Sequence, residues 1–137
     1  MANPRAFVSF DFDHDEIWRR LFVGQAREDS PTPFVIADWS SKLDLPQDQW
    51  EKIIKDKINR CHLMIVLVGR SMSSATGVAK EIRFAKDGNV PFFGVYVDSA
   101  GATSTLPAGL TRSRVIPWTW PGVAAAIDQM MGEGKNA

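Results

Sequence analysis

An uninterrupted apolar run in the middle of the chain constrains the fold more than any other feature. Residues 63–68 read Leu-Met-Ile-Val-Leu-Val, with no polar side chain at any position. A strand with one solvent-exposed face alternates apolar and polar residues. This run is therefore typical of a strand that is covered on both faces, as in a parallel sheet. Because crossover helices cover the faces of such sheets, the run predicts an α/β protein.

Strand patterns and helix patterns alternate along the rest of the chain. The predicted strands are residues 5–10, 34–37, 63–68, 91–97 and 114–116, and an amphipathic helix follows each of the first three and the last. Residues 98–112 are rich in Gly, Ser, Thr and Pro and are predicted to form a loop. This alternation predicts right-handed crossovers and a flavodoxin-like doubly wound sheet of five parallel strands, in the order 2-1-3-4-5, with helices on both faces.

The chain length and charge limit both the architecture and the function. A chain of 137 residues suffices for one domain, and we expect a single domain over residues 1–131 with a flexible C-terminal tail over 132–137. Sixteen basic and sixteen acidic residues cancel, which argues against nucleic-acid binding as the main activity. No apolar run approaches the ~20 residues that span a bilayer, and the single cysteine, Cys61, suits a reducing compartment. We therefore expect a cytoplasmic protein without a membrane partner.

The predicted topology brings polar residues that are distant in the sequence to one edge of the sheet, where they form a candidate site. In doubly wound sheets, ligands bind at the carboxyl ends of the strands, near the switch point between the first and third strands. The polar residues that follow the predicted strands are Asp11 and Asp13, Asp38 and Ser40, Arg70 and Ser71, and Asp98. A phosphate-binding glycine loop is absent from the sequence, which argues against a nucleoside triphosphatase and an ordinary dinucleotide dehydrogenase.

The acidic stretch at residues 11–16 has two interpretations. Its carboxylates could bind a hard cation, or they could cap and complement the positive end of the first helix. Asp13 and Glu16 have the spacing of a capping box, so we predict a helix start with Asp13 as N-cap and no metal site. A phosphoryl-accepting receiver domain is set aside because Gly69 stands where that class needs an aspartate.

Cys61 and His62 are adjacent, but neighbours on a strand point to opposite faces, so we expect a core thiol rather than a catalytic pair.

The five tryptophans divide by position. Trp18 and Trp50 suit helix-to-sheet packing, Trp118 and Trp120 suit closure of the core, and Trp39 could stack on a ring or contact a partner.

Glu81 stands out within the predicted third helix. Val78, Ile82 and Ala85 define the buried face, and Glu81 falls at the margin of that face. Gly77, one turn earlier on the same margin, leaves space beside it. From this geometry alone, a boundary glutamate paired with a lysine or arginine remains the simpler interpretation.

Several segments together resemble the TIR-like domains of prokaryotic signalling proteins, and in particular the stand-alone TIR-like proteins of Thoeris anti-phage defence. The resemblance extends from about residue 4 to about residue 131. Its segments are residues 5–11, 35–40, 63–69 and 118–120, Trp50 with Ile54 and Ile58, and Val78 through Glu81-Ile82 to Ala85.

The resemblance implies a fold, a reaction and a site. Active members cleave NAD at the nicotinamide–ribose bond, and some cyclise the product into an ADP-ribose-type second messenger that activates an effector protein. The resemblance implies that Glu81 is the catalytic glutamate. It also implies that four further residues line the substrate pocket: Phe10, Asp11, Asp38 and Ser71. NAD would be a substrate, with no further cofactor, and self-association or a TIR-like partner would be expected. Cleavage leaves an oxocarbenium-like ribose, which a carboxylate stabilises.

One departure from the family pattern leaves alternatives open. The family often has an aromatic residue four positions before the glutamate, and here that residue is Gly77. The departure favours a second hypothesis, a non-catalytic TIR-like interaction module. A third hypothesis is a nucleoside deoxyribosyltransferase-like enzyme, because residues 76–85 also resemble the glutamate helix of that family. Overall the sequence favours the NAD-cleaving enzyme.

Overall fold

In the part of the chain that the structure describes, five parallel strands and four α-helices alternate, as the sequence pattern predicts. The computed structural model describes residues 4–11, 14–29, 34–39, 46–72 and 75–133. The elements are β1 (Arg5–Ser9), α1 (Glu16–Asp29), β2 (Val35–Trp39), α2 (Gln47–Asn59), β3 (Leu63–Val68), α3 (Thr76–Asp87), β4 (Phe92–Tyr96), the 3-10 turn η2 (Arg112–Arg114), β5 (Val115–Ile116) and α4 (Trp120–Glu133). The strand order is β2-β1-β3-β4-β5, which confirms the predicted doubly wound sheet.

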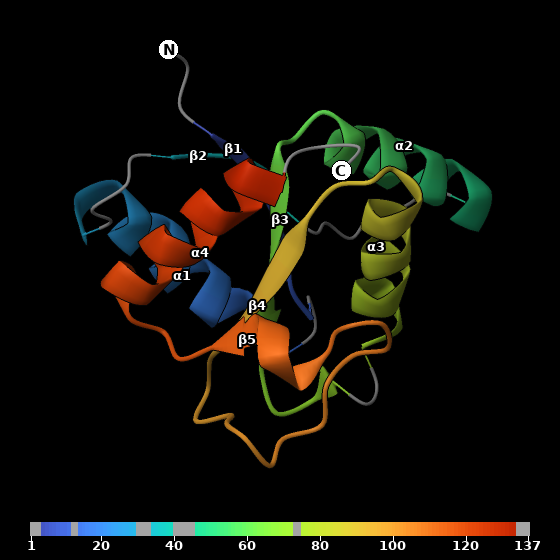
Figure 1. Cartoon of the computed structure of the whole chain (residues 1–137). Helices are drawn as coiled ribbons and strands as arrows, with labels where there is room; N and C mark the ends of the chain where they lie inside the picture. Colours follow the sequence, from blue (N-terminus) through green and yellow to red (C-terminus); the bar gives the residue numbers. More distant parts are fainter. Residues whose placement is uncertain (1–3, 12–13, 30–33, 40–45, 73–74, 134–137) are drawn as a thin grey trace.

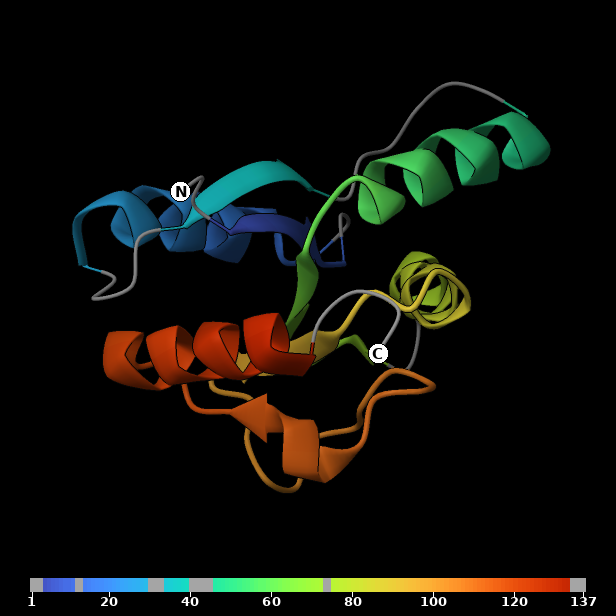
Figure 2. The same cartoon turned by 45° about the horizontal axis from the view of Figure 1, so that its top comes forward.

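The sheet lies between two layers of helices. Helices α1 and α4 cover one face and α2 and α3 cover the other (Figures 1 and 2). All six residues of β3 are buried, because both of its faces are covered, and this confirms the interpretation of the apolar run. Cys61 is 3% exposed, as expected for a core thiol. No helix in the described part of the chain is both long and apolar enough to cross a bilayer.

Side chains of alternate strand residues supply the two cores. On the α2/α3 face, Phe7, Met64, Val66 and Val68 pack with Ile54, Ile58, Val78, Ile82 and Ala85, with Trp50 against them. On the α1/α4 face, Ala6, Val8, Phe10, Ile65, Leu67 and Val95 pack with Phe22, Val123 and Ile127, and Trp18, Trp118 and Trp120 lie against them. The predicted packing of these four tryptophans is therefore confirmed.

Two helix boundaries differ from the sequence-based expectation. Helix α1 begins at Glu16, so Asp15 occupies the N-cap position, while Asp13 lies outside the described residues. Helix α4 continues to Glu133, past the predicted boundary at residue 131.

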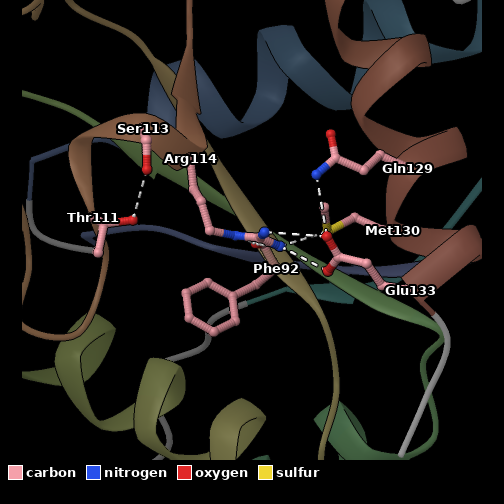
Figure 3. Close-up of polar contacts among 7 residues, drawn as sticks. All are labelled: Phe92, Thr111, Ser113, Arg114, Gln129, Met130 and Glu133. Atoms are coloured by element: carbon pink, nitrogen blue, oxygen red, sulfur yellow. Dashed lines mark hydrogen bonds and ion pairs between the residues drawn. The ribbon is translucent and has the colours of Figure 1, made fainter. Parts of the chain in front are cut away.

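An arginine explains why α4 runs on to Glu133. Arg114, the last residue of η2, donates from Nε and Nη2 to the carbonyl of Phe92, at 3.0 Å and 2.9 Å. Its Nη1 and Nη2 also donate to the two carboxylate oxygens of Glu133, at 3.2 Å and 3.0 Å (Figure 3). Arg114 thereby ties the last turn of α4 to β4, and its guanidinium lowers the pKa of the Glu133 carboxyl.

Replacing Arg114 with methionine is expected to lower the free energy of unfolding by about 1–2 kcal/mol, because the stem is kept while the hydrogen bonds to Phe92 and Glu133 are lost from a partly exposed site. Chemical denaturation measures the change. The exposed pair Arg60–Asp56 offers a matched control, and Arg60→Met is expected to change the free energy by less than about 0.5 kcal/mol. Equal effects of the two substitutions would contradict a clamping role for Arg114.

Candidate functional site

A buried carboxyl on α3 meets a buried hydroxyl on β1. The Glu81 side chain is 1% exposed, and the hydroxyl of Ser9 donates a hydrogen bond of 2.7 Å to its Oε1. Ser9 is the last residue of β1 and is fully buried. Since β1 and β3 are neighbours at the switch point of the sheet, this contact lies where doubly wound proteins bind ligands.

Local structure explains how the two side chains meet. Ser9 lies two residues after Phe7 on β1, so both side chains point toward the α2/α3 face. Glu81 lies three residues after Val78 and one before Ile82, which both pack into the same core. The glutamate is therefore deeper than the boundary position that the helical pattern predicts. The sheet covers it, so the predicted position at the boundary of the buried face is wrong, whereas the predicted pairing with a lysine or arginine stays a prediction.

Space remains beside the glutamate, one helical turn toward the start of α3. Gly77 lies four residues before Glu81 and so shares its side of the helix. Among the described residues, a Cβ atom built on Gly77 meets no atom within 4 Å outside the backbone of its own helix. Ser71, in the turn after β3, is partly exposed at the same edge of the sheet. Position 77 therefore has room for a side chain one turn before Glu81, on the side of the helix that they share.

An acidic group surrounds the start of α1 at this edge. Asp11 follows β1 and is 8% exposed, and its Oδ2 lies 2.6 Å from Nδ1 of His14. Asp15 is 1% exposed, and neither of its carboxylate oxygens has a hydrogen-bond partner among the described residues. Asp98, after β4, forms an ion pair of 3.2 Å with Arg70.

The environment of Asp15 changes its proton affinity. Burial first, and then the negative charges of Asp11 and Asp98, raise the pKa of the Asp15 carboxyl from 3.8 to about 6, against the lowering effect of His14. A Cβ at Gly69 would lie only 2.7 Å from Cγ of Asp15, so the carboxyl packs directly on the backbone after β3. Within the described residues, no group of three or more His, Cys, Asp or Glu side chains is arranged to hold a metal ion.

The remaining predicted pocket residues do not all lie near Glu81. Phe10 is 2% exposed and belongs to the core on the opposite, α1/α4 face of the sheet. There the guanidinium of Arg19 lies 4.6 Å from the ring centroid of Trp39 and 5.9 Å from that of Phe10. The backbone of Asp38 lies in β2, while its side chain is outside the described part of the structure. Asp11 and Ser71 stay at the carboxyl edge, so their predicted roles, like those of Phe10 and Asp38, remain predictions.

Two residues of this edge were missed by reasoning from the sequence. Ser9 was treated as part of the first strand, although a polar residue two positions after a core phenylalanine signals a polar group facing the helix layer. Asp15 was treated as one member of an acidic helix start. Its raised pKa comes first from burial and then from Asp11 and Asp98, and no local pattern reveals the burial or the interaction with Asp98.

Comparisons with known proteins agree with this architecture. A family model described as "Thoeris protein ThsB, TIR-like domain" matches residues 7–102. Among solved structures, one titled "Crystal Structure of a prokaryotic SEFIR domain" is similar to 96% of this chain and 92% of that chain, with a TM-score of 0.51 and 13% sequence identity. At that identity the likeness shows the fold alone. No curated protein matches the chain.

Proposed function

The chain belongs to the TIR-like domain family of the Thoeris protein ThsB, and from that premise we propose that it is an NAD-cleaving signalling enzyme of anti-phage defence. In this proposal Glu81 is the catalytic carboxylate, NAD is the substrate, and the nicotinamide–ribose bond is the bond that breaks. One observation carries the proposal: the Glu81 side chain is buried near the carboxyl ends of the strands. The Ser9 hydroxyl orients it through a hydrogen bond of 2.7 Å to Oε1.

A buried carboxylate suits this reaction because of the charge that develops in the transition state. As the bond to nicotinamide lengthens, positive charge accumulates on the ribose, as in glycoside hydrolysis. A carboxylate away from bulk water interacts with that charge more strongly than an exposed one does. The hydrogen bond from Ser9 fixes the carboxyl in one orientation, so little reorganisation is needed when the charge forms.

The leaving group needs little help from the protein. The nicotinamide of NAD carries a positive charge on its ring nitrogen and departs as a neutral molecule, so no strong general acid is required. Water that adds to the ribose gives ADP-ribose and releases a proton, whereas a nucleophile from the adenosine half of the same molecule gives a cyclic product. Either product is a nucleotide that an effector protein could recognise.

In this proposal the substrate approaches the buried glutamate past Gly77, where no side chain stands in the way. Gly77 lies one turn from Glu81 on the same side of α3, at the end of the helix that faces the carboxyl edge. A planar nicotinamide ring approaching along this path would reach the carboxyl without displacing a side chain of residue 77.

Gly77→Trp is expected to lower the KM for NAD roughly two- to tenfold, because an indole in the open space adds an aromatic face worth about 0.5–1.5 kcal/mol to the nicotinamide ring. Gly24→Trp is the matched control, since Gly24 also lies in a helix with no atom within 4 Å of its Cβ position, and its KM is expected to stay unchanged. Steady-state kinetics measure both. An unchanged KM in Gly77→Trp would show that the nicotinamide does not pass this position.

Incubation of concentrated protein with NAD, followed by chromatography and mass spectrometry, tests the proposed reaction and its product. Free nicotinamide with ADP-ribose indicates hydrolysis, and nicotinamide with a nucleotide lighter by one water indicates cyclisation. A parallel incubation with a deoxynucleoside and a free base tests the transferase alternative. Absence of reaction products in both incubations would favour the non-catalytic interaction module.

A further inference from the structure

The loop between β4 and η2, residues 97–111, reaches from the carboxyl end of β4 to α3. It contains no helix or strand, and it passes beside α3 before it returns to η2 (Figures 1 and 2). Connections longer than about 12–15 residues without helix or strand are uncommon in compact domains and are usually functional. A contribution of this loop to function is therefore expected.

The loop is fixed at two places. Arg112, the first residue of η2, donates to the carbonyl oxygens of Gly101 and Ser104, at 3.2 Å and 2.6 Å. It also donates to the hydroxyl of Tyr96, the last residue of β4, at 3.4 Å. Farther along the loop, the side chain of Leu110 is buried in the α2/α3 core. These contacts hold the loop against the rest of the protein.

Next to Leu110, the backbone of Gly109 lies directly against α3. A Cβ atom built on Gly109 would lie 2.9 Å from Cγ2 of Ile82 and 3.1 Å from Nζ of Lys86. The first distance is shorter than a real Cβ contact, so a side chain at position 109 would have to displace its neighbour. Gly109 also has a φ of 91°, a conformation that favours glycine. Space and backbone conformation thus both require glycine here.

The residue that Gly109 contacts is the neighbour of Glu81 on α3. Ile82 is 1% exposed and packs in the α2/α3 core. Glu81 precedes it, and the Ser9 hydroxyl donates to the Glu81 Oε1 at 2.7 Å. Because the two residues lie in one turn of one helix, a displacement of Ile82 also moves Glu81. A close-packed core transmits such a displacement instead of absorbing it.

We propose that Gly109 is a positioning residue for Glu81. Its backbone lies against Ile82 and holds α3 at the depth at which the Glu81 carboxyl meets the Ser9 hydroxyl. The effect on catalysis rests on the proposed function of Glu81, whereas the effect on the contact between Ser9 and Glu81 does not.

Crystal structures of two glycine variants test the positioning without any substrate. Gly109→Ala is expected to push α3 outward and lengthen the distance from Ser9 Oγ to Glu81 Oε1 beyond ~3.0 Å, the upper limit of an O–H···O hydrogen bond. Gly101→Ala is the matched control, because Gly101 is in the same loop and no atom of the described residues lies within 4 Å of its Cβ position. Its structure is expected to keep the distance of 2.7 Å. An unchanged distance in Gly109→Ala would overturn the proposal.

Steady-state kinetics of nicotinamide release test the effect on catalysis. Gly109→Ala is expected to lower kcat about tenfold or more, because a misplacement of about 1 Å costs up to about 100-fold. KM is expected to stay within about twofold, since no contact with NAD is removed. A raised KM with an unchanged kcat would overturn the effect on catalysis. If the wild type releases no nicotinamide, the proposed function fails, and the crystal structures still decide the positioning.

A substitution on α3 tests whether the contact with Ile82 is the cause. Ile82→Leu removes the Cγ2 methyl that faces Gly109 and keeps the side-chain volume. In this background Gly109→Ala is expected to leave the contact of Ser9 with Glu81 within hydrogen-bond range and to lower kcat by no more than about threefold. The double variant gives the same comparison where Gly109→Ala alone does not fold. A double variant that is unfolded, or that has lost the contact of Ser9 with Glu81, would overturn the proposal.

Discussion

Replacing Glu81 with glutamine is expected to lower kcat/KM for NAD at least about 100-fold, because a neutral amide cannot offset the positive charge that develops on the ribose. The loss is expected mainly in kcat, since the charge is absent from bound NAD and appears only in the transition state. Initial rates of nicotinamide release over a range of NAD concentrations separate kcat from KM.

The fold of the Glu81→Gln protein is expected to persist. Glutamine has the same shape and keeps an oxygen that accepts the hydrogen bond from Ser9, so the free energy of unfolding is expected to change by about 1 kcal/mol or less. Ser9→Ala is the graded companion. It keeps the charge and removes the orienting hydroxyl, so a loss of about tenfold in kcat is expected. A Ser9→Ala loss as large as that of Glu81→Gln would show that the charge is not the main contribution.

Replacing Asp15 with asparagine is expected to raise the free energy of unfolding at pH 7 by about 2–3 kcal/mol. The Asp15 carboxyl is 1% exposed, has no hydrogen-bond partner within the described residues, and faces the carboxylates of Asp11 and Asp98. Its charge is therefore formed at a cost in the folded protein. Asparagine has nearly the same shape, and its amide donates where the carboxylates can accept.

The sign of the pH dependence follows from the raised pKa of Asp15. Between 3.8 and about 6 the folded protein holds the Asp15 proton more tightly than the unfolded chain does, so this group's contribution to stability falls as the pH rises through that window. The advantage of Asp15→Asn over the wild type is therefore expected to be small at pH 4 and complete at pH 7.

Urea denaturation of both proteins at the two pH values measures the advantage, and comparison with the wild type cancels the titration of all other groups. Asp56→Asn, at an exposed position on α2, is expected to show no such gain. An advantage of Asp15→Asn that is equal at pH 4 and pH 7 would contradict the buried charge.

Much of the fold was predictable because the pattern of apolar and polar residues indicates which faces of each strand and helix are buried. The run at 63–68 has no polar position, so it needs apolar cover on both faces, and the alternation around it leaves few topologies. The ends of elements were less predictable. Helix α4 continues to Glu133 because Arg114, distant in sequence, pairs with that residue, and a local pattern does not contain this contact.

The candidate site was predicted in position and only partly in structure. Helical periodicity gives the direction of Glu81 around α3, but the depth of the side chain depends on how β1 lies against the helix. Alternation along β1 gives opposite directions to neighbouring residues, which explains why Ser9 meets Glu81 and Phe10 packs on the other face. The family resemblance assigns both Glu81 and Phe10 to the site. It does not show that their side chains lie on opposite faces of the sheet.

Nicotinamide release by the wild-type protein and by Glu81→Gln, measured side by side at the same high protein concentration, decides whether Glu81 is the catalytic carboxylate. We expect nicotinamide release by the wild type and release near background for the variant, whose free energy of unfolding stays within about 1 kcal/mol of the wild-type value. Release at equal rates from the two proteins would contradict the catalytic role of Glu81. Absence of release from both, together with base exchange on a deoxynucleoside, would replace NAD cleavage with transferase chemistry.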